Sequence, residues 1–559
     1  MNNKFTIINK GTHLYKLSIW CFLITLLFSL NSCGNAKQSK TSMGPQPKLD
    51  SVSIVKVFNA IPAFKDQTLW AKSFYRERDF QLGWFKNHTI VPEAKQLLDV
   101  INRAGEEGLN PKDYQIKDFS KLFAGLEAGQ SDSVKRNELE KEIDLSLTGT
   151  YLNWASDYYR GIVIPTENKE IEWDVKRNKI KLHKALMTFL KERESKYSYA
   201  EFKPLHIEYS YLKEALKKHR QIQAAGGWPK IPANTKLKTG QTSPVVVTLR
   251  KRLMIASDSA ASDSSKYDEP LVSAVKNFQE QNGLKPSGLV GPETINLLNV
   301  PVEQRIQQII INMERWRWLP KSFEPDYLLV NIPEYTLHVI EKGKEVLNMK
   351  VITGKVLNST PIFSDKMETV VLSPYWNVPM SIIIKEFQPK LINNPNYLEH
   401  LDMEIIDNKK NVISASSIDW ASISESNFKY TIRRRPGPKN DLGDVKFIFP
   451  NTNDVYLHDT PHDELFNQSK RSFSHGCVRV EQPIKLAEYL LRNKPGWDKS
   501  NILNTISLRK EKHVALKEKL PVYLVYFTAW ADAEGNMHFR EDIYGHDKKL
   551  ASEYFSKIF

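Results

Sequence analysis

Residues 445–460 have the sequence VKFIFPNTNDVYLHDT, and residues 472–483 have the sequence SFSHGCVRVEQP. Apolar and polar residues alternate in the first stretch and after Cys477 in the second, and this pattern predicts β-strands. Cys477 follows His458 by 19 residues, a separation suited to a long loop between two adjacent strands. We therefore expect a β-rich domain in which His458 and Cys477 lie close together.

A lone thiol beside such a histidine has an obvious chemical use. The thiolate is the form that attacks carbonyl carbons, and at a pKa near 8.5 only a few per cent of a thiol is ionised at neutral pH. A nearby base or positive charge is therefore needed. His458 is the candidate base, because an imidazole can take the proton of Cys477 and later give one to a leaving amine.

The neighbours of Cys477 suit the same chemistry. Gly476 lacks a Cβ, so the backbone can turn sharply and bring the amides of His475, Gly476 and Cys477 toward a substrate oxygen. Arg479, two residues along a strand, points to the same face as Cys477 and can favour a thiolate or hold a carboxylate. We expect the Ser474 hydroxyl to orient His475.

The N-terminal residues 1–33 have the pattern of a secretory signal. Three lysines precede an apolar run over residues 17–30 (LSIWCFLITLLFSL), which is shorter than the roughly 20 residues of a membrane-spanning helix. The residues before Cys33 resemble a bacterial lipoprotein cleavage box, which implies that Cys33 becomes a lipidated first residue. A plain secreted protein or a signal anchor remains the alternative. Gly34 and Asn35 favour an outer-membrane destination over the inner membrane.

The expected export limits which roles the cysteines and the net positive charge can have. Cys21 lies in the signal core and Cys33 is the expected anchor, so Cys477 is the one cysteine left in a compartment that favours disulfides. The chain carries a net charge of +14 over 559 residues. Such a charge suits nucleic acid, anionic lipid or an acidic polymer, and export argues against nucleic acid as a partner.

The pattern along the chain predicts a multidomain α+β protein. Helical periodicity dominates before the GGWPKIP break at 226–232, three short helices follow, and strand alternation begins at Asp326. The expected parts are a signal (1–33), a flexible tether (34–58), a helical domain (59–232), a three-helix module (238–300), a connecting helix (301–325), a β-rich domain (326–510) with an insertion between strands (380–435), and a C-terminal β extension (511–559).

Two stretches resemble known families. AVKNFQEQNGL…SGLVGPETINLL, within 238–300, resembles the peptidoglycan-binding module of bacterial wall enzymes. YLHDTP…FSHGCVRVEQPIKLAEYLL resembles the active-site signature of the L,D-transpeptidase (YkuD) family. ERWRWLP, YWNVP and PGPKNDLGDVKFIFPN extend that likeness to the large, scaffold-bearing YcbB-like branch. The resemblance implies that 326–510 is a β-sandwich catalytic domain of the YkuD kind, that 59–232 is the scaffold domain, and that the insertion at 380–435 is a capping insertion.

The resemblance also implies roles for individual residues. Cys477 would be the nucleophile and His458 the base, and the backbone carbonyl of Asp459 would orient His458. Tyr456 lies on the strand face of His458. The resemblance implies that Trp376 and Asn377 lie near the cleft and that these residues wall the donor peptide.

The family reaction transfers an acyl group between peptidoglycan stem peptides, without metal or other cofactor. The cysteine attacks the third stem residue, releases the terminal D-Ala, and passes the acyl group to an amine of a second stem, giving a 3→3 cross-link. If water accepts the acyl group, the outcome is L,D-carboxypeptidase activity. The implied setting is the periplasmic side of the envelope, with a lipid anchor and other wall-synthesis enzymes as partners. A carbapenem is expected to acylate Cys477.

Other interpretations stay open at this point. His458 and His462 have the i, i+4 spacing of a helical zinc pair, although Pro461 and the preceding strand argue against a helix there. A cysteine endopeptidase of the NlpC/P60 kind would place its cysteine before its histidine. A noncatalytic wall-binding scaffold predicts that Cys477→Ala changes nothing. Arg433, Arg434 and Arg435 either meet stem carboxylates or form a solvated face.

Overall fold

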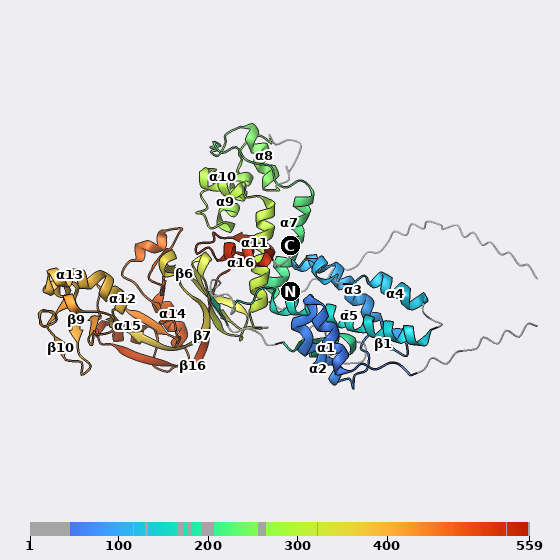
Figure 1. The fold of residues 1–559 in the computed structure, drawn as a ribbon. Coiled ribbons are helices and arrows are strands. Elements are labelled where there is room, and N and C mark those ends of the chain that lie inside the picture. Colours follow the sequence, from blue (N-terminus) through green and yellow to red (C-terminus); the bar gives the residue numbers. More distant parts are fainter. Residues whose placement is uncertain are drawn as a thin grey trace, which may run out of the picture. The chain divides into compact units, whose positions relative to one another are not determined.

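The computed structural model describes residues 45–115, 117–128, 132–165, 172–175, 180–191, 206–254, 264–320, 322–532 and 534–556. It shows a helical N-terminal region, a small three-helix module and a β-rich C-terminal region (Figure 1). The expected multidomain α+β fold is therefore confirmed. The signal with Cys33 lies outside the described residues, as does most of the tether. Within the described ranges, no helix combines the length and apolar character that a membrane crossing requires.

The N-terminal region is built around one long helix, α5 (Ser133–Arg160), whose buried residues pack against those of the neighbouring helices. These helices are α1 (Ser51–Ala60), α2 (Thr68–Arg76), α3 (Pro92–Asn102), α4 (Phe119–Ala128) and α6 (Leu182–Lys191), and a hairpin of β1 (Phe85–Lys86) and β2 (Thr89–Ile90) joins α2 to α3. Helix α7 (Ile207–Ala224) belongs to a separate apolar core, which it shares with residues from 302–319 and 523–554.

The expected tether ends earlier than residue 58. Helix α1 begins at Ser51 because the Asp50 side chain accepts hydrogen bonds from the N–H groups of Val52 and Ser53, which caps the helix. Ile54 and Phe58, one helical turn apart, are fully buried. Residues 51–58 therefore belong to the helical region, and the assignment of this segment to a flexible tether was wrong.

The three-helix module and the connecting helix are found where the sequence predicts them. The module consists of α8 (Pro244–Arg252), α9 (Glu269–Gln281) and α10 (Pro292–Leu298) around a small apolar core of its own. Connecting helix α11 (Val302–Trp318) follows. Trp316 of α11 stacks on Phe527 with ring centroids 4.6 Å apart, so this tryptophan packs against the C-terminal part of the chain.

The β-rich region is a sheet that closes on itself. Its strands are β4 (Tyr327–Asn331), β5 (Thr336–Glu341), β6 (Lys344–Gly354), β7 (Ile362–Leu372), β12 (Val445–Ile448), β13 (Leu457–His458), β15 (Val478–Val480) and β16 (Lys512–Val525). The order is β12-β13-β15-β6-β5-β4-β16-β7, and β12 also pairs with β7. Short strands β14 (Ser472–Ser474) and β3 (Trp173–Asp174) add to β6 and β7.

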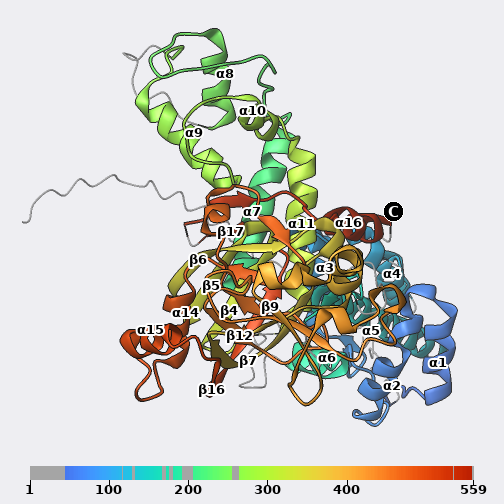
Figure 2. The same cartoon turned by 90° about the vertical axis from the view of Figure 1, so that its left-hand side faces the viewer.

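An apolar core fills the interior of this sheet. Helix α14 (Pro483–Leu491) packs against β12 and β16, and α15 (Lys499–Ser507) packs against β7 (Figure 2). Leu457, Val478 and Val480 belong to the core and are fully buried. Because successive side chains of a strand point to opposite faces, the core residues fix which neighbours face outward.

The segment expected as a C-terminal β extension differs from the prediction. Strand β16 lies between β4 and β7, so residues 512–525 are an interior strand of the closed sheet and not an addition to it. The last five residues of β16 are all buried. An interior strand provides that burial, because it has a neighbouring strand on each side. Beyond β16, β17 (Ala529–Ala531) pairs with β18 (Met537–Phe539), and the described chain ends in helix α16 (His546–Ser556).

The capping insertion has its own sheet and core. The sheet has the order β10-β9-β11-β8, in which β9 is Met403–Ile406, β10 is Val412–Ile413, β11 is Thr431–Arg434 and β8 is Trp376–Asn377. Helices α12 (Met380–Ile382) and α13 (Gln388–Asn393) flank a π-helical turn at Ile383–Phe387. A separate apolar cluster that includes Leu391 and Ile432 fills this lobe.

One ion pair in α11 is completely buried, so removing one of its partners should destabilise the fold strongly. Both side chains of the Glu314–Arg317 pair have 0% exposure, and Glu314 also accepts the N–H of Val163 at 2.9 Å. We expect Glu314→Ala to lower the free energy of unfolding by about 3 kcal/mol, because Arg317 would keep a buried charge without its counterion. Urea denaturation followed by tryptophan fluorescence measures this.

The matched control is Glu138→Ala, which breaks another i, i+3 ion pair, to Lys141, with exposures of 69% and 30%. Exposed pairs contribute about 0.5 kcal/mol or less. Equal losses in the two variants would contradict the assignment of the α11 pair as a buried structural element.

Candidate active site

The candidate site lies on the outer face of the closed sheet. Leu457 and Val478 point into the core, so the residues next to them in each strand point outward. Strands β13 and β15 pair in parallel, with Leu457 opposite Val478 and His458 opposite Arg479. His458 and Cys477 are therefore diagonal neighbours on one face, where Cβ atoms lie roughly 7 Å apart. The prediction that a long loop joins adjacent strands is confirmed.

His458 is held as a neutral base. Its Nδ1 lies 2.5 Å from the backbone carbonyl oxygen of Asp459. A carbonyl only accepts, so Nδ1 carries the proton and Nε2 keeps the free electron pair. The ring is 5% exposed. Burial, with the nearby charge of Arg479, lowers the pKa of His458 to about 3, although the bond to Asp459 raises it.

Cys477 is protonated in the resting site. Burial raises the pKa of its thiol above the ordinary value, while hydrogen bonds from the Tyr456 backbone and hydroxyl, and the charge of Lys446, act in the opposite direction. The thiol donates to the carbonyl oxygen of Asp454, with Sγ and O 3.9 Å apart. The resting pair is thus a neutral thiol and a neutral imidazole, and not a preformed ion pair.

The loop that carries the cysteine is fixed by Ser474. The Ser474 hydroxyl donates to the carbonyl of Cys477 at 2.5 Å and accepts the N–H of Gly476 at 3.1 Å. The expectation that Ser474 orients His475 is therefore wrong, because the hydroxyl is used to close the turn. Gly476 has φ of +118°, a conformation that favours glycine. Its N–H, one of the three expected oxyanion donors, already has a partner.

The His475 side chain points toward the capping insertion. Its Nε2 lies 3.5 Å from a carboxylate oxygen of Glu386, in the π-helical turn of that lobe. The side chain is half exposed. His475 thus contributes its backbone to the cysteine loop, and its ring links the loop to the insertion.

The predicted substrate-binding residues fall into two groups. Tyr456 and Arg479 lie beside the pair: the rings of Tyr456 and His458 are 5.6 Å apart between centroids, and Arg479 is the register partner of His458. Trp376 and Asn377 lie in β8, just before the capping insertion, and β8 joins the sheet of the insertion by pairing with β11. Their roles in binding stay predictions.

The three arginines at 433–435 have partners within the insertion and its neighbouring loop. Arg433 and Arg435 form ion pairs with Glu404, and Arg434 pairs with Asp441 at 2.5 Å. These contacts favour a structural use of the three charges over the binding of stem carboxylates.

Asp459 has a second task besides its backbone bond to His458. Its carboxylate accepts the N–H groups of Asp444 and Thr460, each at 2.7 Å. Burial raises the pKa of this carboxyl to about 6, against the effect of these bonds. The side chain therefore secures the turn that aims the carbonyl at the imidazole.

Lys446 is a site residue that the sequence analysis missed. It lies directly opposite His458 in the β12–β13 ladder, and its Nζ is 3.8 Å from the centre of the Tyr456 ring. Burial lowers its pKa, and the charge of Cys477 acts to raise it. The signal was present in VKFIF, where a lysine occupies an outward position between the core residues Val445 and Phe447.

The zinc interpretation is not supported by the geometry. His458 belongs to a strand and His462 precedes a 3₁₀ helix, so their i, i+4 spacing does not place them on one helical face. His462 is 56% exposed. In the described ranges, no group of three or more histidine, cysteine, aspartate or glutamate side chains is arranged to hold a metal.

Comparison with known families identifies the class of each region. Residues 325–502 match the L,D-transpeptidase catalytic domain, residues 70–216 match the Scaffold domain, and residues 242–298 match a provisionally described peptidoglycan binding domain. The resemblance found in the sequence is thus confirmed.

A named protein is also similar to part of this chain. A Haemophilus influenzae protein provisionally named an L,D-transpeptidase is 36% identical over 244 residues, which are 44% of this chain and 49% of the relative. The chain therefore spans about half the length of the curated relative it matches.

Two solved structures are also similar to the chain. An L,D-transpeptidase fragment from Xylanimonas cellulosilytica is 16% identical, with 53% of this chain and 99% of that chain covered and a TM-score of 0.18. An L,D-transpeptidase from Stackebrandtia nassauensis is 14% identical, with 53% and 96% covered and a TM-score of 0.19.

The protonation states predict how thiol alkylation depends on pH. Because the pKa of Cys477 is raised, the thiolate fraction should keep increasing with pH up to and beyond the ordinary thiol pKa of about 8.5. The rate of iodoacetamide alkylation of the Cys477 peptide, followed by mass spectrometry, should therefore rise about tenfold per pH unit between about pH 6 and 8.

The urea-unfolded chain is the control, since its thiol should level off near the ordinary pKa. A rate plateau between pH 5 and 7 in the folded protein would show a thiolate–imidazolium ion pair at rest and would contradict the neutral pair.

Proposed function

We propose that this protein is a cysteine-dependent L,D-transpeptidase that forms 3→3 cross-links in peptidoglycan. The observation that carries the proposal is the parallel β13–β15 pairing, which sets a neutral His458, with its proton on Nδ1, diagonally beside the thiol of Cys477. The matched catalytic and peptidoglycan-binding domains support the same substrate class.

The first half-reaction makes a thioester. As a donor tetrapeptide binds, His458 Nε2 takes the thiol proton and the sulfur attacks the carbonyl carbon of the third stem residue. The C–S bond forms and the carbonyl electrons move to oxygen, giving an oxyanion that backbone N–H groups stabilise. When that oxyanion collapses, the C–N bond breaks, and the leaving D-Ala amine receives the proton from His458.

The second half-reaction transfers the acyl group. An amine from a second stem attacks the thioester, His458 takes one amine proton, and the C–S bond breaks to release the thiolate, which is reprotonated. Burial disfavours the imidazolium, so the proton stays on His458 only briefly; the Asp459 carbonyl stabilises it during that time through Nδ1–H.

Cationic side chains beside the thiol suit a substrate rich in carboxylates. Arg479 shares the outer face with Cys477, and Lys446 is the register partner of His458. The Nε of Arg479 is buried, with no hydrogen-bond partner among the described residues. A stem carboxylate would satisfy these groups, and their charges would also stabilise the thiolate as it forms.

A test with purified tetrapeptide muropeptides distinguishes the candidate functions. The wild-type protein should give an acyl-enzyme by intact mass, followed by cross-linked dimers. Cys477→Ala should abolish both, and His458→Gln should lower the acylation rate by about 100-fold or more, because a general base contributes that much. His462→Gln is the matched control, as this histidine is exposed, and it should keep full activity.

The other outcomes assign the alternatives. Free tripeptides without dimers would indicate an L,D-carboxypeptidase, in which water accepts the acyl group. Neither product, from a folded protein that binds peptidoglycan, would indicate a noncatalytic wall-binding scaffold. The same thiolate chemistry makes a carbapenem, with its strained carbonyl, an expected acylating inhibitor of Cys477.

We further propose that Cys33 is lipidated and anchors the protein on the periplasmic side of the envelope, with the outer membrane favoured. The support is the sequence pattern of residues 1–33. Metabolic labelling with a fatty acid should mark the wild-type protein and leave Cys33→Ser unlabelled and released from the membrane fraction. Labelling that survives the substitution would contradict the anchor, and equal release of both proteins would do the same.

A further inference from the structure

The peptide bond between Gly476 and Cys477 is held from beneath by a buried threonine. Thr360 Oγ1 donates to the carbonyl oxygen of Gly476 at 2.8 Å and accepts the N–H of Gly354 at 2.9 Å. Thr360 is 1% exposed, so the bond is shielded from water. The hydroxyl has one proton to donate, and the structure uses it on the cysteine loop.

Thr360 is itself held by Tyr544, which lies beyond the matched catalytic region. The Tyr544 hydroxyl donates to the carbonyl oxygen of Gly354 at 2.6 Å and accepts the backbone N–H of Thr360 at 3.3 Å. It thereby ties together the two ends of the segment 354–360. Burial raises the pKa of Tyr544, so the phenol keeps its proton and remains a donor.

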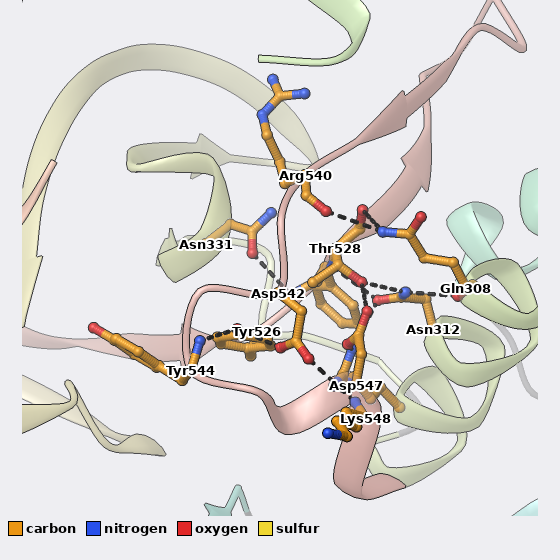
Figure 3. Close-up of polar contacts among 12 residues, drawn as sticks. Gln308, Asn312, Asn331, Tyr526, Thr528, Arg540, Asp542, Tyr544, Asp547 and Lys548 are labelled. Carbon is orange, nitrogen blue, oxygen red and sulfur yellow. Dashed lines mark hydrogen bonds and ion pairs between the residues drawn. The ribbon is translucent and has the colours of Figure 1, made fainter. Parts of the chain in front are cut away.

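The backbone of Tyr544 is positioned by a polar network in the C-terminal part of the chain (Figure 3). The Tyr526 hydroxyl accepts the N–H of Tyr544 at 2.9 Å and donates to Asp542 at 2.7 Å. Asn312 of α11 bonds both the N–H and the hydroxyl of Thr528 in the same network. Tyr544 is therefore not on a loose terminus but is fixed to the connecting helix.

Because the Gly476–Cys477 peptide is planar, fixing its carbonyl also fixes the direction of the Cys477 N–H. In a trans peptide the C=O and the following N–H point in opposite directions. When Thr360 holds the Gly476 carbonyl below the loop, the N–H of Cys477 must point away from the buried side. The N–H of Gly476 is already given to Ser474, which leaves the Cys477 N–H as the better placed donor for the oxyanion.

We propose that Thr360 and Tyr544 are positioning residues for acyl transfer, which aim the Cys477 N–H at the oxyanion by fixing the Gly476–Cys477 peptide. This inference rests on the proposed function, because it concerns the same thioester chemistry. By this proposal, the C-terminal segment after residue 502 contributes to catalysis, because its Tyr544 holds Thr360 in place.

The test compares two reactions of Cys477 in the full-length protein. Acylation by a carbapenem passes through an oxyanion, whereas alkylation by iodoacetamide needs the thiolate but forms no oxyanion. Thr360→Val keeps the side-chain shape and removes the hydroxyl. We expect the acylation rate to fall by about 10-fold to 100-fold, while the alkylation rate stays within about 2-fold of wild type.

Two further variants distinguish positioning from simple destabilisation. Thr360→Ser, which keeps the donor, should restore acylation, and Tyr544→Phe should lower acylation by about 10-fold without slowing alkylation. Tyr554→Phe is the matched control: it removes a buried hydroxyl from the same segment, one that donates to Gly108, and should leave both rates unchanged.

The outcomes separate this inference from the function on which it rests. If wild-type protein forms no acyl-enzyme, the proposed function fails. If wild type is acylated and Thr360→Val is acylated equally fast, only the positioning role is overturned. A parallel loss of acylation and alkylation in Thr360→Val would also overturn it, since the variant would then have changed the thiol itself.

Discussion

The site depends on one constraint, the parallel pairing of β13 with β15. Parallel strands need a crossover between them, and residues 459–477 provide it. His458 is the last residue of β13, and Cys477 comes directly before the first residue of β15. The core residues Leu457 and Val478 fix the register of the pair, because a slip by one residue would turn apolar side chains outward. The packing of the core therefore determines whether the histidine and the cysteine share a face.

Burial then sets the protonation states on that face. It lowers the pKa of His458 and raises the pKa of Cys477, so both groups are neutral until a substrate binds. The cations Lys446 and Arg479 act against this effect at the sulfur and favour the thiolate. The site thus keeps the resting thiol protonated and less open to oxidation, while the neighbouring cations stabilise the thiolate when it forms.

The sequence was informative where a feature depends on local pattern. Strand alternation, the spacing of His458 and Cys477, the three-helix module and the connecting helix were all predicted, because periodicity and turn residues act over a few positions. The L,D-transpeptidase signature also lies in short stretches of the chain.

Features that depend on tertiary contacts were missed. Tyr544 reaches the site through buried bonds to Thr360 and Gly354, which lie 184 and 190 residues earlier in the chain. The outward position of Lys446 followed from the local pattern, but its place opposite His458 depends on the pairing of β12 with β13. The Ser474 hydroxyl bonds the carbonyl of Cys477 only because the loop turns there. Strand β16 lies between β4 and β7 because the sheet closes on itself. Helix α1 was taken for a tether because its buried face has only two core residues, Ile54 and Phe58.

The central claim is that His458 is a neutral base with its proton on Nδ1, oriented by Asp459. Nitrogen-15 spectra of the histidine side chains, with His458 assigned from His458→Gln, test it directly. The account predicts an Nδ1–H tautomer whose shifts stay constant from pH 8 down to at least about pH 5, given a pKa of about 3. A ring that titrates near the ordinary pKa of about 6.5, or that carries its neutral proton on Nε2, would contradict the account.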